Sequence, residues 1–225
     1  FQIMPSGLSL YGELGRVVAR RFSKVALVYQ DTSATFQNAA TEFETTFDHG
    51  AEKITSDIYP IKDQMDSVRI ATIISNKKYD AVSVLATPSV GASFLKSWYS
   101  LKNDGEKIFC NPDMEVTISI YVDVLGLEAL DGCVSVFFEN QNTSVFSEMY
   151  EKEYGKDPSF AADYAFDLIG LIESTYVNDI NKWKNNLSSI EYSGLSGLIR
   201  FNDDGTRISN YSKKVFVDGK FIETP

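Results

Sequence analysis

The stretch KVALVYQDTSATFQNAATEFETTFDHG, residues 24–50, decides the fold of this chain. Its first part is a short apolar run with β-branched residues, which is typical of a buried strand. Its second part has apolar residues at spacings of four, three and four, at Phe36, Ala40, Phe43 and Phe47. This spacing places them on one face of a helix, and Gly50 follows as a helix stop. A strand is therefore followed directly by a helix.

The same alternation continues toward the C-terminus. Further strands are predicted at 53–59, 81–86, 107–111 and 133–138. Helices are predicted between them at 65–80, 89–105 and 112–131. We expect Pro60 to close the second strand and Asp66 or Ser67 to cap the helix after it. Strands that alternate with helices predict an α/β fold with a parallel, doubly wound sheet covered on both faces.

Part of the last predicted helix could also form a strand, because residues 118, 120 and 122 are apolar and alternate with other residues.

Parallel sheets bind ligands in the crevice beyond the carboxyl ends of their strands. We therefore expect binding residues in the loops at 30–36, 87–91 and 111–115.

The pattern changes after residue 142. From there to about residue 189 the periodicity predicts helices alone, and β structure returns from residue 194. Asp204-Gly205 and Asp218-Gly219 are dipeptides typical of tight turns. Helices that have an apolar face but no strands of their own need an outside surface to cover that face.

Composition excludes several classes of protein. The chain has 225 residues and is 44% hydrophobic, so it can bury a core. Its net charge of −10 argues against a nucleic-acid partner, because phosphate binding needs clustered Lys and Arg. No apolar run approaches the length of a membrane span. With one histidine, His49, and two cysteines, we expect no metal site and no cofactor.

The two cysteines are Cys110 and Cys133. The first lies near the end of the predicted strand at 107–111, and the second lies at the start of the strand at 133–138. Neighbouring parallel strands would place these positions at opposite ends, whereas a disulfide needs Cα atoms within about 7 Å. We therefore expect two buried thiols rather than a disulfide.

Four segments, in this order along the chain, resemble the type I periplasmic binding proteins, specifically the leucine/isoleucine/valine-binding group of ABC-transporter receptors. They are FQIMPS (1–6), KVALVYQD (24–31), AADYAFDLIGLI (161–172) and GLSGLIRFNDDGTR (194–207) with its continuation VFVDGKFI (215–222). The first is similar to a crossover between lobes, and the second to the strand that opens the second lobe. The last two are similar to a helix of the first lobe and to the closing segment of the family.

The resemblance implies two α/β lobes joined by three crossings, near 3–6, 138–141 and 197–202. Residues 1–138 and 197–225 would then form the C-terminal lobe, and residues 139–196 the helical part of an N-terminal lobe. Most of that N-terminal lobe, on the order of one hundred residues, would precede the chain. We therefore expect the chain to bind ligand more weakly than the longer protein, and a second copy to cover the helices at 142–196.

The resemblance also implies a function without catalysis. The protein would capture a small polar solute, such as an amino acid or a related carboxylate, and deliver it to an ABC permease. It would lie in the periplasm or outside the cell, with a lipid anchor in the longer protein.

Asp113 is the first candidate binding residue. It follows the strand at 107–111, where the family often places an acid that accepts the ammonium group of the ligand. The alternative is that Asn111 caps a helix, Pro112 begins it and Asp113 complements the helix dipole. Thr87 and Ser89 follow the strand at 81–86 and could meet a polar ligand with their hydroxyl groups, although Ser89 is also a suitable helix cap.

Ser33, Thr35 and Phe36 lie in the first loop between strand and helix. The family has Tyr-Gly where this chain has Thr35-Phe36, and the difference removes an aromatic hydroxyl group and puts a branched-chain pocket in doubt. Phe36 could still form a wall of the ligand pocket, but its register with Ala40 and Phe43 also suits a core residue.

Two other functions remain open. The same fold serves as the ligand-sensing ectodomain of signalling receptors. An α/β enzyme with an unrecognised site is the second, although GLSGL at 194–198 is not a nucleophile elbow, because that motif would need Gly in place of Leu198. We expect no enzyme activity.

Overall fold

The computed structural model describes residues 1–47, 55–102, 104–139, 143–158 and 161–224. The chain divides into two compact units. The helical unit contains residues 1–6 and 138–211, and the α/β unit contains residues 7–137 and 212–225. His49, Gly50 and residues 140–142, which include part of the second predicted crossing, lie outside the described residues. The assignment of the chain to two lobes of a larger protein stays a prediction.

The α/β unit is built on a four-stranded sheet in the order β2-β1-β3-β4. Its strands are β1 (Lys24–Gln30), β2 (Thr55–Ile61), β3 (Ala81–Leu85) and β4 (Lys107–Ile108). Every neighbouring pair is parallel, which confirms the predicted sheet. β1 and β3 are the central strands, and four residues of β1 and all five of β3 are buried because helices cover both faces.

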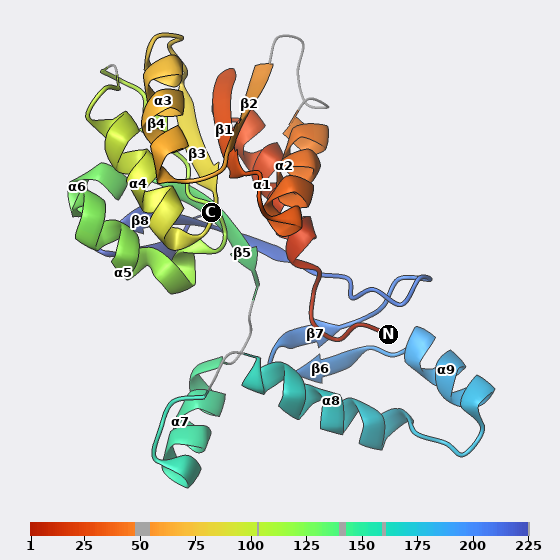
Figure 1. Cartoon of the computed structure of the whole chain (residues 1–225). Helices are drawn as coiled ribbons and strands as arrows, with labels where there is room; N and C mark the ends of the chain where they lie inside the picture. Colours follow the sequence, from red (N-terminus) through yellow and green to blue (C-terminus); the bar gives the residue numbers. More distant parts are fainter. Residues whose placement is uncertain (48–54, 103, 140–142, 159–160, 225) are drawn as a thin grey trace. The chain divides into compact units, whose positions relative to one another are not determined.

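Helices cover this sheet on both sides (Figure 1). They are α1 (Gly7–Ala19), α2 (Ala34–Phe47), α3 (Gln64–Ser75), α4 (Pro88–Tyr99) and α5 (Met114–Leu125). α1 and α2 lie on one side, and α3 and α4 lie on the other. The helical reading of residues 112–131 is confirmed, since α5 contains residues 118, 120 and 122. The doubly wound α/β architecture is thus the one the sequence predicts.

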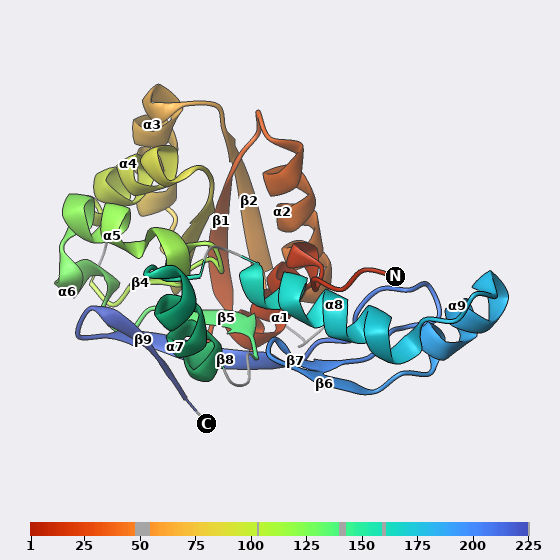
Figure 2. The ribbon, with the colours of Figure 1, turned by 90° about the horizontal axis from the view of Figure 1, so that it is seen from below.

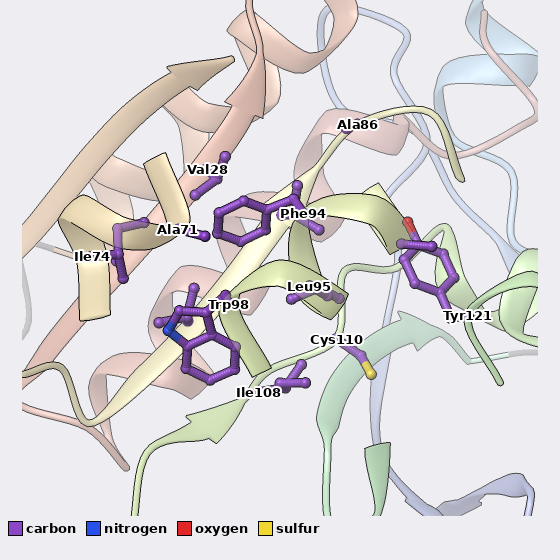
Figure 3. Packing of buried hydrophobic residues seen from close by; sticks show 14 of the residues in the cluster. Val28, Ala71, Ile74, Ala86, Phe94, Leu95, Trp98, Ile108, Cys110 and Tyr121 are labelled. Carbon is purple, nitrogen blue, oxygen red and sulfur yellow. The ribbon is translucent and has the colours of Figure 1, made fainter. Parts of the chain in front are cut away.

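An extensive apolar cluster of the α/β unit lies between the sheet and α3–α5. Figure 3 shows part of it, in which Phe94 and Trp98 of α4 lie near Ala71 and Ile74 of α3 and near Val28 of β1. Both aromatic side chains are fully buried. Burial of one such side chain stabilises a fold by roughly 1.5–3 kcal/mol, so this cluster contributes strongly to the packing of these helices on the sheet.

A second sheet in the order β5-β8-β9 completes the α/β unit (Figure 2). Its strands are β5 (Val134–Phe138), β8 (Tyr211–Val217) and β9 (Lys220–Glu223), and the short helix α6 (Leu127–Leu130) precedes it. Asp218 and Gly219 have φ of +50° and +85° at the β8–β9 turn, which confirms the predicted tight turn. The strand predicted at 133–138 therefore belongs to another sheet, joined to β4 by the parallel bridge between Phe109 and Val134.

Three expected element boundaries were wrong. β2 continues through Pro60 to Ile61, because β2 is an edge strand, where a residue without an N–H group is tolerated. Asp63 caps α3, since its carboxylate accepts hydrogen bonds from the N–H groups of Met65 and Asp66. Thr87 rather than Ser89 is the residue before α4.

The expectation of two free thiols was also wrong, because Cys110 and Cys133 form a disulfide with Cα atoms 5.6 Å apart. The prediction assumed that the two strands begin at the same level. Instead β5 begins level with the end of β4, where Phe109 pairs with Val134. The N–H of Cys110 donates to the oxygen of Val134 beside this bridge, at 2.9 Å, and there the two cysteines are close enough to bond.

The helical unit contains three helices and one small antiparallel sheet among its described residues. The helices are α7 (Thr143–Tyr154), α8 (Ala162–Thr175) and α9 (Ile180–Ser188), and the sheet consists of β6 (Tyr192–Gly194) and β7 (Gly197–Ile199). The predicted helical run up to about residue 189 is confirmed.

Among the described helices of the chain, none has both the length and the apolar character that a bilayer span requires.

Candidate functional site

Polar side chains gather at the carboxyl edge of the parallel sheet. Gln30 is the last residue of β1, and its Oε1 atom accepts hydrogen bonds from both the backbone N–H and the hydroxyl group of Thr87, each at 3.0 Å. Its Nε2 atom donates to the Thr32 hydroxyl group at 3.1 Å. Gln30 therefore joins the loop after β1 to the loop after β3, and both lie at the edge where such sheets bind ligands.

Asp113 lies in the next loop of this edge, directly before α5. The hydroxyl group of Tyr11, from α1, donates to its Oδ2 atom at 2.6 Å. Asp113 is exposed, and within the described part of the chain its Oδ1 atom accepts no hydrogen bond. One carboxylate oxygen is thus held by the protein, and the other is open to a donor from a ligand.

Hydrogen bonds of the buried Asn111 hold the loop that carries Asp113. The Nδ2 atom of buried Asn111 donates to the backbone oxygen of Val84 in β3, at 2.6 Å. The backbone N–H of Met114 donates to the oxygen of Asn111 at 3.1 Å. Asn111 is therefore a tie between the loop and the central strand, not the helix cap that the alternative reading proposed. Asp113 occupies the cap position without a side-chain capping bond.

Two buried tyrosines flank Asp113. Burial and the negative charge of Asp113 raise the pKa of Tyr11 above its ordinary value. Burial, and to a smaller extent the same carboxylate, raises the pKa of Tyr121 to about 12. A methyl group added at Gly91 would lie 2.5 Å from the Tyr121 hydroxyl oxygen, so this glycine permits the close approach of α4 to α5. Both phenols stay protonated near neutral pH and can donate hydrogen bonds.

The other predicted residues lie along the same edge. Ser33 precedes α2 and is half-buried, and its backbone oxygen accepts a hydrogen bond from the N–H of Gln37. Thr35 and Ser89 are exposed in the first turns of α2 and α4. Phe36 is half-buried, whereas Phe43 and Phe47 of the same helix are fully buried. Phe36 is therefore partly available as a wall for a ligand.

The sequence pattern did not single out Gln30 or Tyr11 at this edge, and it indicated Asn111 only as a possible helix cap. Gln30 was predicted to lie in the loop after the first strand, but nothing in the pattern set it apart. Tyr11 lies 102 residues from Asp113 along the chain. A contact over that separation leaves no local signal in the sequence.

Within the described ranges, no three or more His, Cys, Asp or Glu side chains are grouped as a metal ion would require. The groups at the edge are a carboxylate, hydroxyls and amides, which suit hydrogen bonds to a small polar molecule.

Solved structures share the fold of this chain, although its sequence matches no known family. No protein-family model and no curated protein matches the sequence. Solved structures do match, among them a leucine-binding protein from Thermotoga maritima, with a TM-score of 0.74 and 17% identity over 97% of this chain and 65% of that chain. An extracellular ligand-binding receptor from Verminephrobacter eiseniae has a TM-score of 0.78 and 14% identity, over 99% and 67%.

A solute-binding protein of an ABC transporter from R. palustris, in complex with benzoate, has a TM-score of 0.68 and 15% identity, over 99% of this chain and 64% of that chain. The chain has the fold of a type I periplasmic binding protein. It spans about two thirds of the length of these three structures, 64–67%. At such low identity the likeness shows the fold alone.

The helical unit contains a buried polar cluster that the sequence pattern did not predict. Asp167 of α8 is buried, and its carboxylate accepts hydrogen bonds from the backbone N–H groups of Leu195 and Ser196 and from the Ser196 hydroxyl group, at 2.7, 2.8 and 2.6 Å. Arg207 donates to the Ser196 hydroxyl group at 2.9 Å and to the backbone oxygen of Ile3 at 3.1 Å.

These contacts join the helix segment at 161–172 to the closing segment at 194–207 within this chain. A methyl group at Gly194 would lie 2.4 Å from the Asp167 carboxyl carbon, so glycine is required for the turn to approach the carboxylate. The guanidinium carbon of Arg207 also lies 5.6 Å from the centre of the Tyr164 ring. Asp167 is therefore a structural acid inside the helical unit.

Proposed function

We propose that this chain is part of an extracytoplasmic solute-binding protein that captures a small carboxylate-bearing solute without chemical change. The type I fold supports the proposal, since the three solved structures that it resembles are described as binding or receptor proteins. The observation that carries it is the carboxylate of Asp113, with one oxygen held by Tyr11 and the other open at the carboxyl edge of the sheet.

An amino acid is the solute class that this carboxylate favours. An ammonium group near the open Oδ1 atom of Asp113 would gain a charge-assisted hydrogen bond. The hydroxyl groups of Ser33, Thr35, Thr87 and Ser89 line the same edge of the sheet and supply further polar contacts. Phe36 supplies an apolar wall. The neighbours of known structure are described with leucine and with benzoate, so a carboxylate is a feature common to both described ligands.

Transport is the role that we infer for the longer protein. A solute-binding protein of this fold passes its ligand to an ABC permease, and it lies in the periplasm or outside the cell, where a lipid anchor would hold it. One matched structure is described as a receptor, so a ligand-sensing ectodomain is the second candidate. A permease that shows ligand-stimulated ATP hydrolysis with this protein would favour transport over sensing.

A second copy of the chain is the protein partner that we infer for the helical unit. Met149 of α7 and Phe166 and Ile169 of α8 are 61%, 53% and 61% exposed and form one apolar surface with neighbouring side chains. Exposure of such an apolar surface to water is unfavourable in free energy, and association would bury it. Light scattering after size exclusion should find a dimer that Ile169→Glu dissociates and that Ile180→Glu, on exposed α9, does not. A monomer at micromolar concentration would contradict this inference.

Calorimetry with two probes tests the solute class. L-leucine carries an ammonium group and benzoate does not, so Asp113→Asn should weaken binding of L-leucine by about tenfold or more and leave benzoate within about twofold. Asp131→Asn is the matched control, because it removes the same charge at an exposed position before β5. An equal loss for both probes would refute the role of Asp113.

Mass spectrometry of the purified protein tests the function itself. A small carboxylate released on denaturation would support solute capture. If none is released and neither probe binds at millimolar concentration, solute binding by this chain is rejected.

A further inference from the structure

The Cys110–Cys133 disulfide joins the two sheets of the α/β unit. Cys110 follows β4 of the parallel sheet, and Cys133 precedes β5 of the second sheet. The two segments also share the Phe109–Val134 bridge and a hydrogen bond of 2.9 Å from the N–H of Cys110 to the oxygen of Val134. β4 itself is two residues long. The covalent link therefore lies where the segment directly after this very short strand pairs with β5 of the second sheet.

The same link lies at the root of the candidate binding loop. Cys110 is followed by Asn111, Pro112 and Asp113, and α5 begins at Met114. Asn111 ties the loop to β3 at 2.6 Å, and Tyr11 holds Asp113 at 2.6 Å. Every residue of 110–114 except Asp113 is buried. The loop is thus a short segment between the disulfide and a helix, and a shift at Cys110 would be passed to Asp113.

Both cysteines are buried, and Cys133, with an exposed fraction of 2% against 0% for Cys110, is the one that borders a hollow. It lines a hollow of about 260 Å³ together with Trp98, Ile108 and Gly132. Cys110 is fully buried in the apolar cluster, where Figure 3 shows it near Leu95 and Ile108. The hollow lies at the starts of β4 and β5, whereas Asp113 follows the end of β4. A reductant in the hollow would not occupy the candidate ligand site.

We propose that the Cys110–Cys133 disulfide positions Asp113, so that affinity for a ligand with an ammonium group depends on the redox state of this pair. The inference rests on the proposed function for its ligand, but not for the positioning of the loop. The intact bond fixes the start of the loop. Without it, the loop gains freedom at Cys110, the Asn111 and Tyr11 contacts form only part of the time, and the carboxylate of Asp113 takes more than one position.

The chemical step is a thiol–disulfide exchange with a small dithiol. One thiolate of the dithiol attacks Sγ of Cys133, the S–S bond breaks, and Cys110 leaves as a thiolate that takes up a proton. The second thiol of the dithiol then displaces Cys133, which also takes up a proton. The protein gains two thiols and two electrons, and the dithiol becomes a cyclic disulfide.

Hydrogen exchange followed by mass spectrometry tests the positioning. Amides at 109–117 should exchange about tenfold faster or more in the Cys110→Ala/Cys133→Ala variant and in the wild type reduced with dithiothreitol, while amides of β1 stay unchanged. Re-oxidation of the reduced wild type should restore the slow exchange, and the double variant should not respond to dithiothreitol. Unchanged exchange at 109–117, or an equal increase in every peptide, would overturn the proposal.

Binding of L-leucine and benzoate tests whether the disulfide affects ligand affinity through Asp113. A disulfide that only stabilised the fold would change the affinity for both probes equally. Reduction should weaken L-leucine by about tenfold and leave benzoate within about twofold, because benzoate has no ammonium group for Asp113. An equal effect on both probes would overturn the link to Asp113. If the oxidised chain binds neither probe, the proposed function fails, and the exchange measurement still decides whether the disulfide positions the loop. If the double variant does not fold, reduction and re-oxidation of the wild type decide alone.

Discussion

The buried carboxylate of Asp167 accepts two hydrogen bonds from Ser196, at 2.8 Å from its backbone N–H and at 2.6 Å from its hydroxyl group. A third comes from the backbone N–H of Leu195. All the groups that face this carboxylate in these bonds are donors. An acid at this position therefore stabilises the turn between β6 and β7 in a way that no neutral side chain can match.

Replacing Asp167 with Asn should destabilise the helical unit by about 3 kcal/mol. The amide can accept through one oxygen only, and its NH₂ group would face backbone N–H groups that then lack an acceptor. Urea unfolding followed by the fluorescence of Trp183, which lies in this unit, measures the loss. Glu173→Gln, an exposed acid on the same helix, is the matched control and should change little. Equal effects of the two substitutions would refute the structural role of Asp167.

Replacing Gly15 with Ala should destabilise the α/β unit by about 1–3 kcal/mol. The added methyl group would lie 2.6 Å from the backbone oxygen of Phe43 in α2, and backbone cannot move aside as a flexible side chain can. Thermal unfolding measures the change. Gly7→Ala in the same helix is the control, because no atom lies within 4 Å of the position of its methyl group. A Gly15→Ala variant as stable as Gly7→Ala would show that α1 and α2 can separate freely.

Replacing Tyr11 with Phe should cost about 1 kcal/mol and weaken L-leucine binding. The variant loses the hydrogen bond to Asp113 and keeps the buried ring. The released carboxylate then takes several orientations, and a ligand must order it again. Calorimetry and urea unfolding check the two effects. Tyr99→Phe, at an exposed position at the end of α4, should leave both unchanged.

The sequence predicted the parts of the fold that depend on local pattern. The alternation around 24–50 is local, since a buried strand and an amphipathic helix each have their own period, and it was enough to predict the parallel sheet. The offset between β4 and β5 is not local, because the Phe109–Val134 pairing depends on how two sheets meet. For that reason the disulfide was missed.

The sequence predicted the edge of the sheet at which the candidate site lies. It did not predict the hydrogen bonds between the residues of that site. Thr87, Ser89 and Asp113 follow strands, so their placement at the carboxyl edge follows from the topology alone. The hydrogen bonds that organise the edge involve Gln30 and Tyr11, and they reach 57 and 102 residues along the chain. The structural role of Asp167 left no signal in the sequence, because its partners lie 28 and 29 residues away in a turn.

Alkaline pH should unfold the chain earlier than its net charge alone would suggest. Burial raises the pKa values of Tyr11, Tyr79, Tyr121 and Tyr164 above the ordinary value of 10.0. In the unfolded chain these phenols ionise near pH 10, while in the folded chain they stay protonated. The unfolded state therefore binds fewer protons above about pH 10. Stability from this source is fully present below that pH and is lost as the pH rises beyond it.

Urea unfolding at a series of pH values checks this expectation, with phenolate absorbance recorded on the same samples. The unfolding midpoint should stay level up to about pH 9 and fall above about pH 10, and part of the phenolate signal should appear only as the chain unfolds. In the Tyr11→Phe/Tyr121→Phe variant the fall should be shallower, because two of the phenols whose ionisation drives it are gone. A midpoint that falls equally steeply in both proteins would show that the buried phenols near Asp113 do not control the alkaline stability of the chain.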